Sequence, residues 1–200
     1  GGSIIVTGDD SDACESNASG CWNDRINLAL ERDVIQAFNM LAYIHAEDPT
    51  FARTCHEFAH DPGLHTYRLY GSSIPLTGKM GYCNSGFFHG YMEGFVAHNP
   101  DPVVADAFCE EVGRKISHVF PDAEMQCIHG IGHGAMEYSI SVYPEYWSKP
   151  LELMRRAAEM CEAATHSDDE RFRCLSGSFG VWRDWVTSKN RKFTQDDAIM

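Results

Sequence analysis

A repeated pattern of cysteine, glycine and histidine constrains the fold of this 200-residue chain more than any other feature. The pattern Cys-x-x-Gly-x-x-His-Gly-x-Met-Glu starts at Cys83 and recurs 44 residues later at Cys127. A third copy from Cys174 keeps the first glycine and ends in the acid Asp184, but it has Gly180 in place of the histidine. Internal repeats of this kind are typical of folds that stack copies of one supersecondary unit.

A second set of three segments alternates with these copies. Each opens with a proline, which is tolerated in the first turn of a helix because that N–H has no intrahelical partner. Asp48, Asp101 and Ser148 are the expected N-caps of these helices. A cysteine follows two to three turns into each helix, at Cys55, Cys109 and Cys161.

The alternation predicts three helical hairpins that follow a long N-terminal helix. Apolar residues at helical spacing support that lead-in helix, and no strand pattern is visible. We expect Pro62 to end the first helix of the first hairpin. The sequence therefore predicts one all-α domain of about eight helices, either a short stack or a closed bundle. Its expected boundaries are residues 4–200, with the lead-in helix at 24–47, the hairpins at 48–97, 101–140 and 149–187, and a polar tail at 188–200.

The eight cysteines contain no Cys-x-x-Cys pair, so they indicate disulfides rather than a zinc cluster. Pairing within each hairpin is the simplest arrangement, although pairing between neighbouring hairpins stays open. Disulfides imply a secreted or periplasmic protein, or the outer domain of a membrane protein. The expected bridges are Cys14–Cys21, Cys55–Cys83, Cys109–Cys127 and Cys161–Cys174.

The charge of the chain restricts its partners. Sixteen basic and 29 acidic side chains give a net charge of −13. Such a chain repels phosphate backbones and anionic lipid surfaces, so we expect no nucleic-acid partner. No apolar run reaches the length of a membrane span, so we expect no membrane insertion. The ten histidines and the surplus of acid favour binding of cations instead.

The repeated helices also carry candidate metal ligands. Residues at the second, sixth and tenth steps after the cysteine share one helix face. In the second copy these are His129, His133 and Glu137, and the first copy has His89 and Glu93. A histidine and a carboxylate one turn apart can bind a metal together, or the carboxylate can orient the ring. The alternative is a buried histidine–glutamate pair that only satisfies its own polar atoms. The two glycines of each copy lie on another face, where we expect close packing on the other helix of the same hairpin.

The first hairpin adds the sequence His56-Glu57-x-x-His60. This motif resembles the active-site helix of zinc metalloproteases, where the two histidines bind zinc and the glutamate acts as general base. The residues that follow resemble the metzincin pattern, except that Thr66 stands where the third histidine belongs and His65 comes one residue earlier. The resemblance covers about ten residues.

We expect the stacked hairpins to bring these motifs to one centre. Glu57 is then the candidate general base, in a metal-dependent enzyme that we expect to be a hydrolase rather than an oxidase, acting on a small molecule or a peptide. Zinc is the favoured metal, with copper, iron and manganese left open. A non-catalytic helical repeat module that binds a protein or peptide is the alternative, and metal storage or transport is a third. The candidate ligands are His56, His60, His89, His129, His133, Glu93 and Glu137.

Overall fold

The computed structural model describes residues 18–187, and the regular structure in this range is entirely helical. The expected all-α fold with eight α-helices is confirmed for this part of the chain. Three short 3₁₀ segments accompany the α-helices: η2 (Gly78–Gly81), η3 (Cys83–Ser85) and η4 (Pro144–Tyr146). The α-helices are α1 (Ala18–Leu30), α2 (Val34–Glu47), α3 (Pro49–Tyr70), α4 (Gly86–His98), α5 (Pro102–Ile116), α6 (Ala123–Val142), α7 (Pro150–Ala163) and α8 (Asp168–Thr187).

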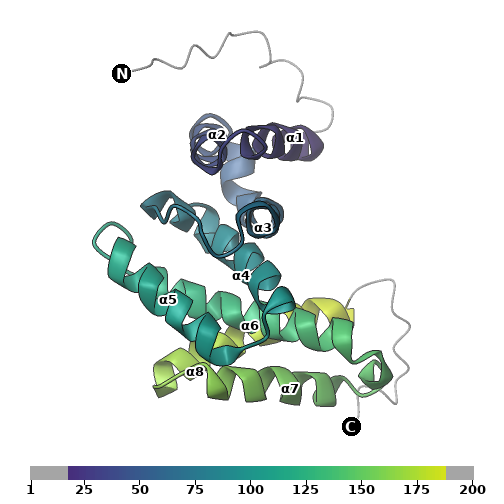
Figure 1. Ribbon diagram of the computed structural model, residues 1–200. Coiled ribbons are helices and arrows are strands. Elements are labelled where there is room, and N and C mark those ends of the chain that lie inside the picture. Colours follow the sequence, from purple (N-terminus) through teal and green to yellow (C-terminus); the bar gives the residue numbers. More distant parts are fainter. Residues whose placement is uncertain (1–17, 188–200) are drawn as a thin grey trace.

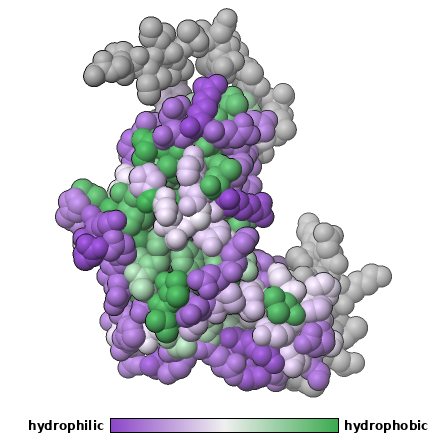
Figure 2. All heavy atoms as spheres, in the orientation of Figure 1, coloured by the Kyte–Doolittle hydropathy of each residue, from purple (hydrophilic) through white to green (hydrophobic). Residues whose placement is uncertain are grey.

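A row of four packed helices runs through the molecule. Helix α3 packs on α4, α4 on α6, and α6 on α8. Helices α1 and α2 pack at the α3 end of the row, whereas α5 and α7 pack on α6 (Figure 1). One large apolar core joins α1 through α6 and extends to Cys161 of α7 and Cys174 of α8, and a smaller core lies between α6, α7 and α8. The face shown in Figure 2 is largely hydrophilic, with a few apolar patches.

Disulfides join the helices of each hairpin, as the repeat predicts. They link α3 to the turn before α4, α5 to α6, and α7 to α8. The remaining predicted bridge, Cys14–Cys21, falls outside the described residues because Cys14 does. The three bridges fit an oxidising, extracytoplasmic environment. No helix in the described range is long and apolar enough to cross a membrane. The observed pairs are Cys55–Cys83, Cys109–Cys127 and Cys161–Cys174, with Cα–Cα distances of 5.3, 5.4 and 5.6 Å.

Two of the three predicted N-caps are confirmed. The Asp48 carboxylate accepts hydrogen bonds from the first backbone N–H groups of α3, and the Asp101 carboxylate does the same for α5. The prediction for Ser148 was wrong, because Lys149 occupies the N-cap position of α7 and caps it with no side-chain hydrogen bond. Helix α7 therefore begins one residue later than the pattern indicates.

The long lead-in helix over residues 24–47 was also wrong in part, because it is broken into α1 and α2. The break lies at Asp33, whose backbone is extended. Its carboxylate accepts hydrogen bonds from Ile35 N at 2.6 Å and Gln36 N at 3.4 Å. An aspartate that caps a new helix in this way competes with continuation of the previous one.

Pro62 does not end its helix, contrary to the expectation. Helix α3 continues through it to Tyr70, and the buried Thr66 hydroxyl donates to the carbonyl of Pro62 at 2.7 Å. Gly63 packs directly on the backbone of α4, where a Cβ atom would lie 2.7 Å from Tyr91 N. We attribute the continuity of α3 to this packing, which outweighs the one backbone hydrogen bond that proline removes.

The repeated glycines do mediate close packing, but the expected partner was right only for the first hairpin. Gly86 and Gly90 of α4 lie against the backbone of α3, its hairpin partner. Gly130 and Gly134 of α6 lie against α4 instead of α5, and a Cβ on Gly134 would be 2.6 Å from Met92 O. The glycine face of each repeat therefore packs on the preceding helix of the row.

Candidate metal centre

Five histidines and one glutamate gather where α3, α4 and α6 pack together. The spacing of four residues puts each pair on one side of its helix. The glycine contacts bring the three helices close enough for these side chains to meet. The cluster consists of His56 and His60 from α3, His89 and Glu93 from α4, and His129 and His133 from α6.

The α3 pair is held by acceptors on α4 and on the turn before it. His56 Nδ1 lies 3.1 Å from the carbonyl oxygen of Cys83, and His60 Nδ1 lies 3.0 Å from Glu93 Oε1. A carbonyl and a carboxylate only accept, so the Nδ1 of each ring is the donor. The two Nε2 atoms are left facing one another at 3.4 Å.

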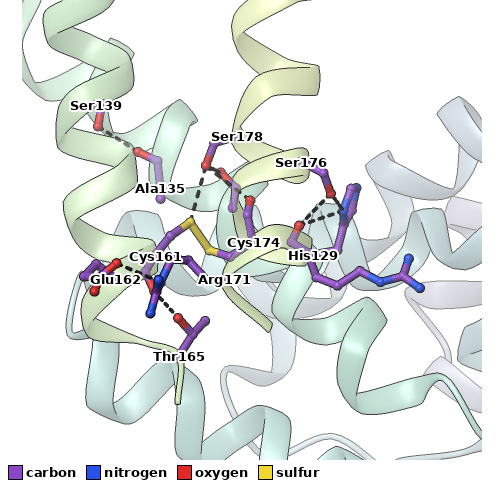
Figure 3. The surroundings of a disulfide bond; sticks show 12 residues. His129, Ala135, Ser139, Cys161, Glu162, Thr165, Arg171, Cys174, Ser176 and Ser178 are labelled. Atoms are coloured by element: carbon purple, nitrogen blue, oxygen red, sulfur yellow. Dashed lines mark hydrogen bonds and ion pairs between the residues drawn. A yellow bond between two sulfur atoms is a disulfide. The ribbon is translucent and has the colours of Figure 1, made fainter. Parts of the chain in front are cut away.

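The α6 pair repeats this arrangement. His129 Nδ1 lies 3.1 Å from the carbonyl of Arg173 and 2.9 Å from Ser176 Oγ, which reaches it from α8 (Figure 3). His133 Nδ1 lies 3.3 Å from Glu93 Oε1, the same oxygen that accepts from His60. The Nε2 atoms of His129 and His133 face one another at 3.3 Å.

The distance between the facing nitrogens suits a metal ion. Tetrahedral zinc with Zn–N bonds of about 2.0–2.1 Å separates its nitrogen ligands by about 3.3 Å. A proton shared in a hydrogen bond can also hold two facing Nε2 atoms together. A metal ion can take the place of that proton. Ligand histidines typically donate their other ring N–H to a carboxylate or a carbonyl, as all four histidines do here.

His89 occupies the centre of the cluster and is only 3% exposed. Its ring centroid lies 4.5–5.4 Å from those of the four other histidines. Neither of its ring nitrogens has a hydrogen-bond partner within the described part of the chain. Burial, and then the charge of the neighbouring histidines, lower the pKa of His89, which favours the neutral ring. A neutral imidazole offers a lone pair to a metal.

Burial and hydrogen bonding also shift the pKa values of four other groups in the cluster. Burial raises the pKa of Glu93, but the hydrogen bonds from His133 and His60 lower it more, to about 2. Burial lowers the pKa of His129 to about 4, and burial also lowers that of His133 despite the opposing effect of Glu93. Burial lowers the pKa of His60, but the hydrogen bond and charge of Glu93, together with the charges of Glu57 and Asp61, raise it overall. At neutral pH the cluster therefore combines an ionised Glu93 with neutral rings at His89, His129 and His133.

A cavity of about 540 Å³ opens beside the cluster. Glu57 and Glu137 line it, and both side chains are exposed. Gly180 of α8 also lines it, at the repeat position that carries a histidine in α4 and α6. A Cβ on Gly180 would have no described heavy atom within 4 Å, so the missing histidine leaves room at this position. The other lining residues are His56, His60, Glu93, His129, His133, Ser176, Val181, Arg183, Asp184 and Trp185.

The structure thus brings together six of the seven ligand candidates read from the sequence, while their binding of a metal stays a prediction. Glu137 lines the cavity but belongs to none of the ligand groups within 4.8 Å. His65, which comes one residue before the position of the third metzincin histidine, also lies outside these groups. The third histidine grouped with the α3 pair is His89 of α4, so the similarity to metzincins does not extend past the His-Glu-x-x-His motif.

Sequence reasoning did not single out the groups that hold His56 and His129. Two of these groups are backbone carbonyls, and every residue has one, so the sequence cannot indicate which of them accepts the hydrogen bond. The third, Ser176, had a signal, because it occupies the second step of the third repeat.

Comparisons of the chain with protein-family models, with curated proteins and with solved structures found no match. The site is therefore interpreted from its own chemistry. The disulfides and the histidine–glutamate cluster fit an extracytoplasmic metal-binding protein.

Proposed function

We propose that this protein is an extracytoplasmic metalloenzyme that holds a transition metal in the histidine cluster and hydrolyses a small molecule in the adjoining cavity. His89 carries the proposal, because both of its ring nitrogens are buried without a hydrogen-bond partner in the described chain. Each buried, unsatisfied polar group costs about 1–3 kcal/mol. A metal ion bound to His89 would remove that cost for the nitrogen that it contacts.

The alternative, a purely structural cluster, explains less. A structural histidine–glutamate pair satisfies its own polar atoms, as the hydrogen bonds of His60 and His133 to Glu93 do. A structural role does not explain why the Nε2 atoms of the other four histidines face one another in two pairs. It also does not explain why the ring of His89 between them has no hydrogen-bond partner in the described chain. Metal binding accounts for both features.

The donor set narrows the choice of metal. Imidazole nitrogens suit zinc, copper, iron and nickel, whereas magnesium and calcium prefer oxygen ligands. The carboxylate oxygen Glu93 Oε1 is shared between two histidines, so we assign it to orienting the rings. Three imidazoles and an open position are the arrangement of a catalytic zinc site. We therefore favour zinc.

The cavity supports a small substrate over a peptide. Its volume of about 540 Å³ falls within the usual range of small-molecule sites, about 300–1,000 Å³. Arg183 supplies a guanidinium that is paired with Asp184, and Trp185 supplies an aromatic wall. The described residues include no strand whose edge an extended peptide would join.

Glu57 is the proposed general base. A zinc ion held by the histidines would lower the pKa of a bound water and so supply a nucleophile at neutral pH. Glu57 lines the cavity on the same helix as His56 and His60, with a solvent-exposed carboxylate that can accept a proton. Glu93 is less suited to this role, because its oxygen already accepts two hydrogen bonds.

Elemental analysis of untagged protein, after loading with zinc and removal of excess metal, tests the binding. We expect bound zinc in the wild type and a loss of metal in His89→Ala. His65→Ala is the matched control, since it removes a histidine of α3 that lies outside the ligand groups. Zinc content equal in wild type and His89→Ala would refute the site.

The catalytic role of Glu57 is tested with p-nitrophenyl esters as probes. Loss of a general base slows a reaction by about 10²–10⁴-fold, so we expect Glu57→Gln to lower kcat to this extent with zinc content unchanged. Glu47→Gln, an exposed glutamate at the end of α2 outside the cavity, is the control. Wild-type activity in Glu57→Gln would refute this role, and hydrolysis independent of zinc would refute the enzyme assignment.

A further inference from the structure

The histidine cluster contains two histidine pairs with the same arrangement, and a single metal ion would bind at only one of them. One histidine pair lies on α3 and the other on α6, with α4 packed between the two helices. In each pair one ring donates to a backbone carbonyl and the other to Glu93 Oε1. The facing Nε2 atoms are 3.4 Å apart in one pair and 3.3 Å apart in the other. The cluster therefore contains two nearly equal half-sites.

His89 lies within reach of both half-sites. Its ring centroid is 5.0 Å from that of His56 and 5.4 Å from that of His60. It is 4.6 Å from that of His129 and 4.5 Å from that of His133. One nitrogen each from His56, His60 and His89 lie within 4.8 Å of one another, and the same holds for His89, His129 and His133. Each half-site thus becomes a three-nitrogen set only by including His89.

The two ring nitrogens of His89 indicate how many metal ions the cluster binds. Both are buried and lack a hydrogen-bond partner in the described chain. If one ion bound one nitrogen, the other would stay buried and unsatisfied, at a cost of about 1–3 kcal/mol. The two ring nitrogens point away from one another in the ring plane, so they can serve two different ions.

We infer that the cluster binds two transition-metal ions, one in each half-site, joined by the ring of His89. This inference rests on the proposed metal-binding function and specifies its stoichiometry. The neutral ring carries one N–H proton, and that proton passes to solvent when the second ion binds. His89 then bridges the ions as an imidazolate, whose negative charge reduces the repulsion between two cations. The Glu93 carboxylate, shared by both half-sites, lies between them as a second anionic group.

Loading the untagged protein with Cu²⁺ tests this inference, because the Cu²⁺ spin reports on a bridge. Bound copper is counted by elemental analysis, and unpaired spins are counted by electron paramagnetic resonance at low temperature. We expect two copper ions per chain and a spin count far below two, since an imidazolate couples the two spins. The control His65→Ala should behave like the wild type.

Variants of one half-site show whether the coupling arises from the bridge. His56→Ala with His60→Ala should bind one copper with a full spin count, and so should His129→Ala with His133→Ala. Circular dichroism checks that each variant is folded. In folded His89→Phe, any copper that still binds should give one spin per ion.

The possible failures are distinguishable. One copper per wild-type chain, or two with a full count of two spins, would overturn the bridged pair and leave the metal-binding proposal standing. No bound copper after loading, together with no bound zinc, would overturn both.

Discussion

Substitution of Gly90 by alanine tests the close helix packing on which the metal centre depends. Gly90 is buried in α4 against the backbone of His60 in α3. An added Cβ would overlap the carbonyl oxygen of His60 and lie 2.6 and 2.7 Å from its carbonyl carbon and Cα. Because these are backbone atoms, no rotation of a side chain can relieve the overlap, and α3 and α4 must move apart.

The expected change in stability follows from two opposing effects. Alanine in place of glycine favours a helix by about 1 kcal/mol, whereas overpacking costs about 1–3 kcal/mol. The overlap here is with backbone, so we place its cost at the upper end and expect a net loss of about 2 kcal/mol. Gly180→Ala is the matched control, since its Cβ has no described heavy atom within 4 Å. The control should gain about 1 kcal/mol, so the two variants should differ by about 3 kcal/mol.

Urea unfolding of the metal-free proteins with their disulfides intact, followed by far-ultraviolet circular dichroism, measures this difference. Zinc affinity of the folded variants is the second readout, because separation of α3 from α4 would displace His60 from His89. We expect weaker zinc binding in Gly90→Ala and wild-type binding in Gly180→Ala. Equal stability of the two variants would refute the view that glycine contacts set the spacing of these helices.

Two further predictions concern the charges of the centre. Glu93→Gln should weaken zinc binding by about 10–100-fold, as is usual when a group that orients metal-binding histidines is lost. Competition with a chelating dye measures the zinc affinity. An affinity equal to that of the wild type would show that Glu93 does not orient the rings. The metal-free protein should lose stability as the pH falls below about 6.5, the ordinary histidine pKa, because the unfolded chain then binds protons that the folded chain excludes at His89, His129 and His133. The loss should approach about 1.4 kcal/mol per pH unit for each such histidine, opposed only in part by His60, whose pKa is raised. Urea unfolding at pH 7.5, 6.0 and 5.0 checks this, and equal stability at the three pH values would contradict it.

The sequence by itself was sufficient for the local features of this protein. The recurrence of the cysteine pattern predicted the helix pairs and their disulfides, because cysteines at equivalent places in a repeated unit have equivalent neighbours. Asp48 and Asp101 predicted two helix starts, since an N-cap acts only on the residues that follow it. The histidine–glutamate spacing likewise placed candidate ligands on single helix faces.

Tertiary structure decided everything that depends on which helices meet. Pro62 remains within α3 because this helix packs closely on α4. The repeat could not show that α6 packs its glycines on α4 rather than on α5. That choice brings the histidines of α3 and α6 together around His89. A helix face fixes only the direction in which a side chain points, and the partner that it meets is set by contacts between residues far apart in the chain.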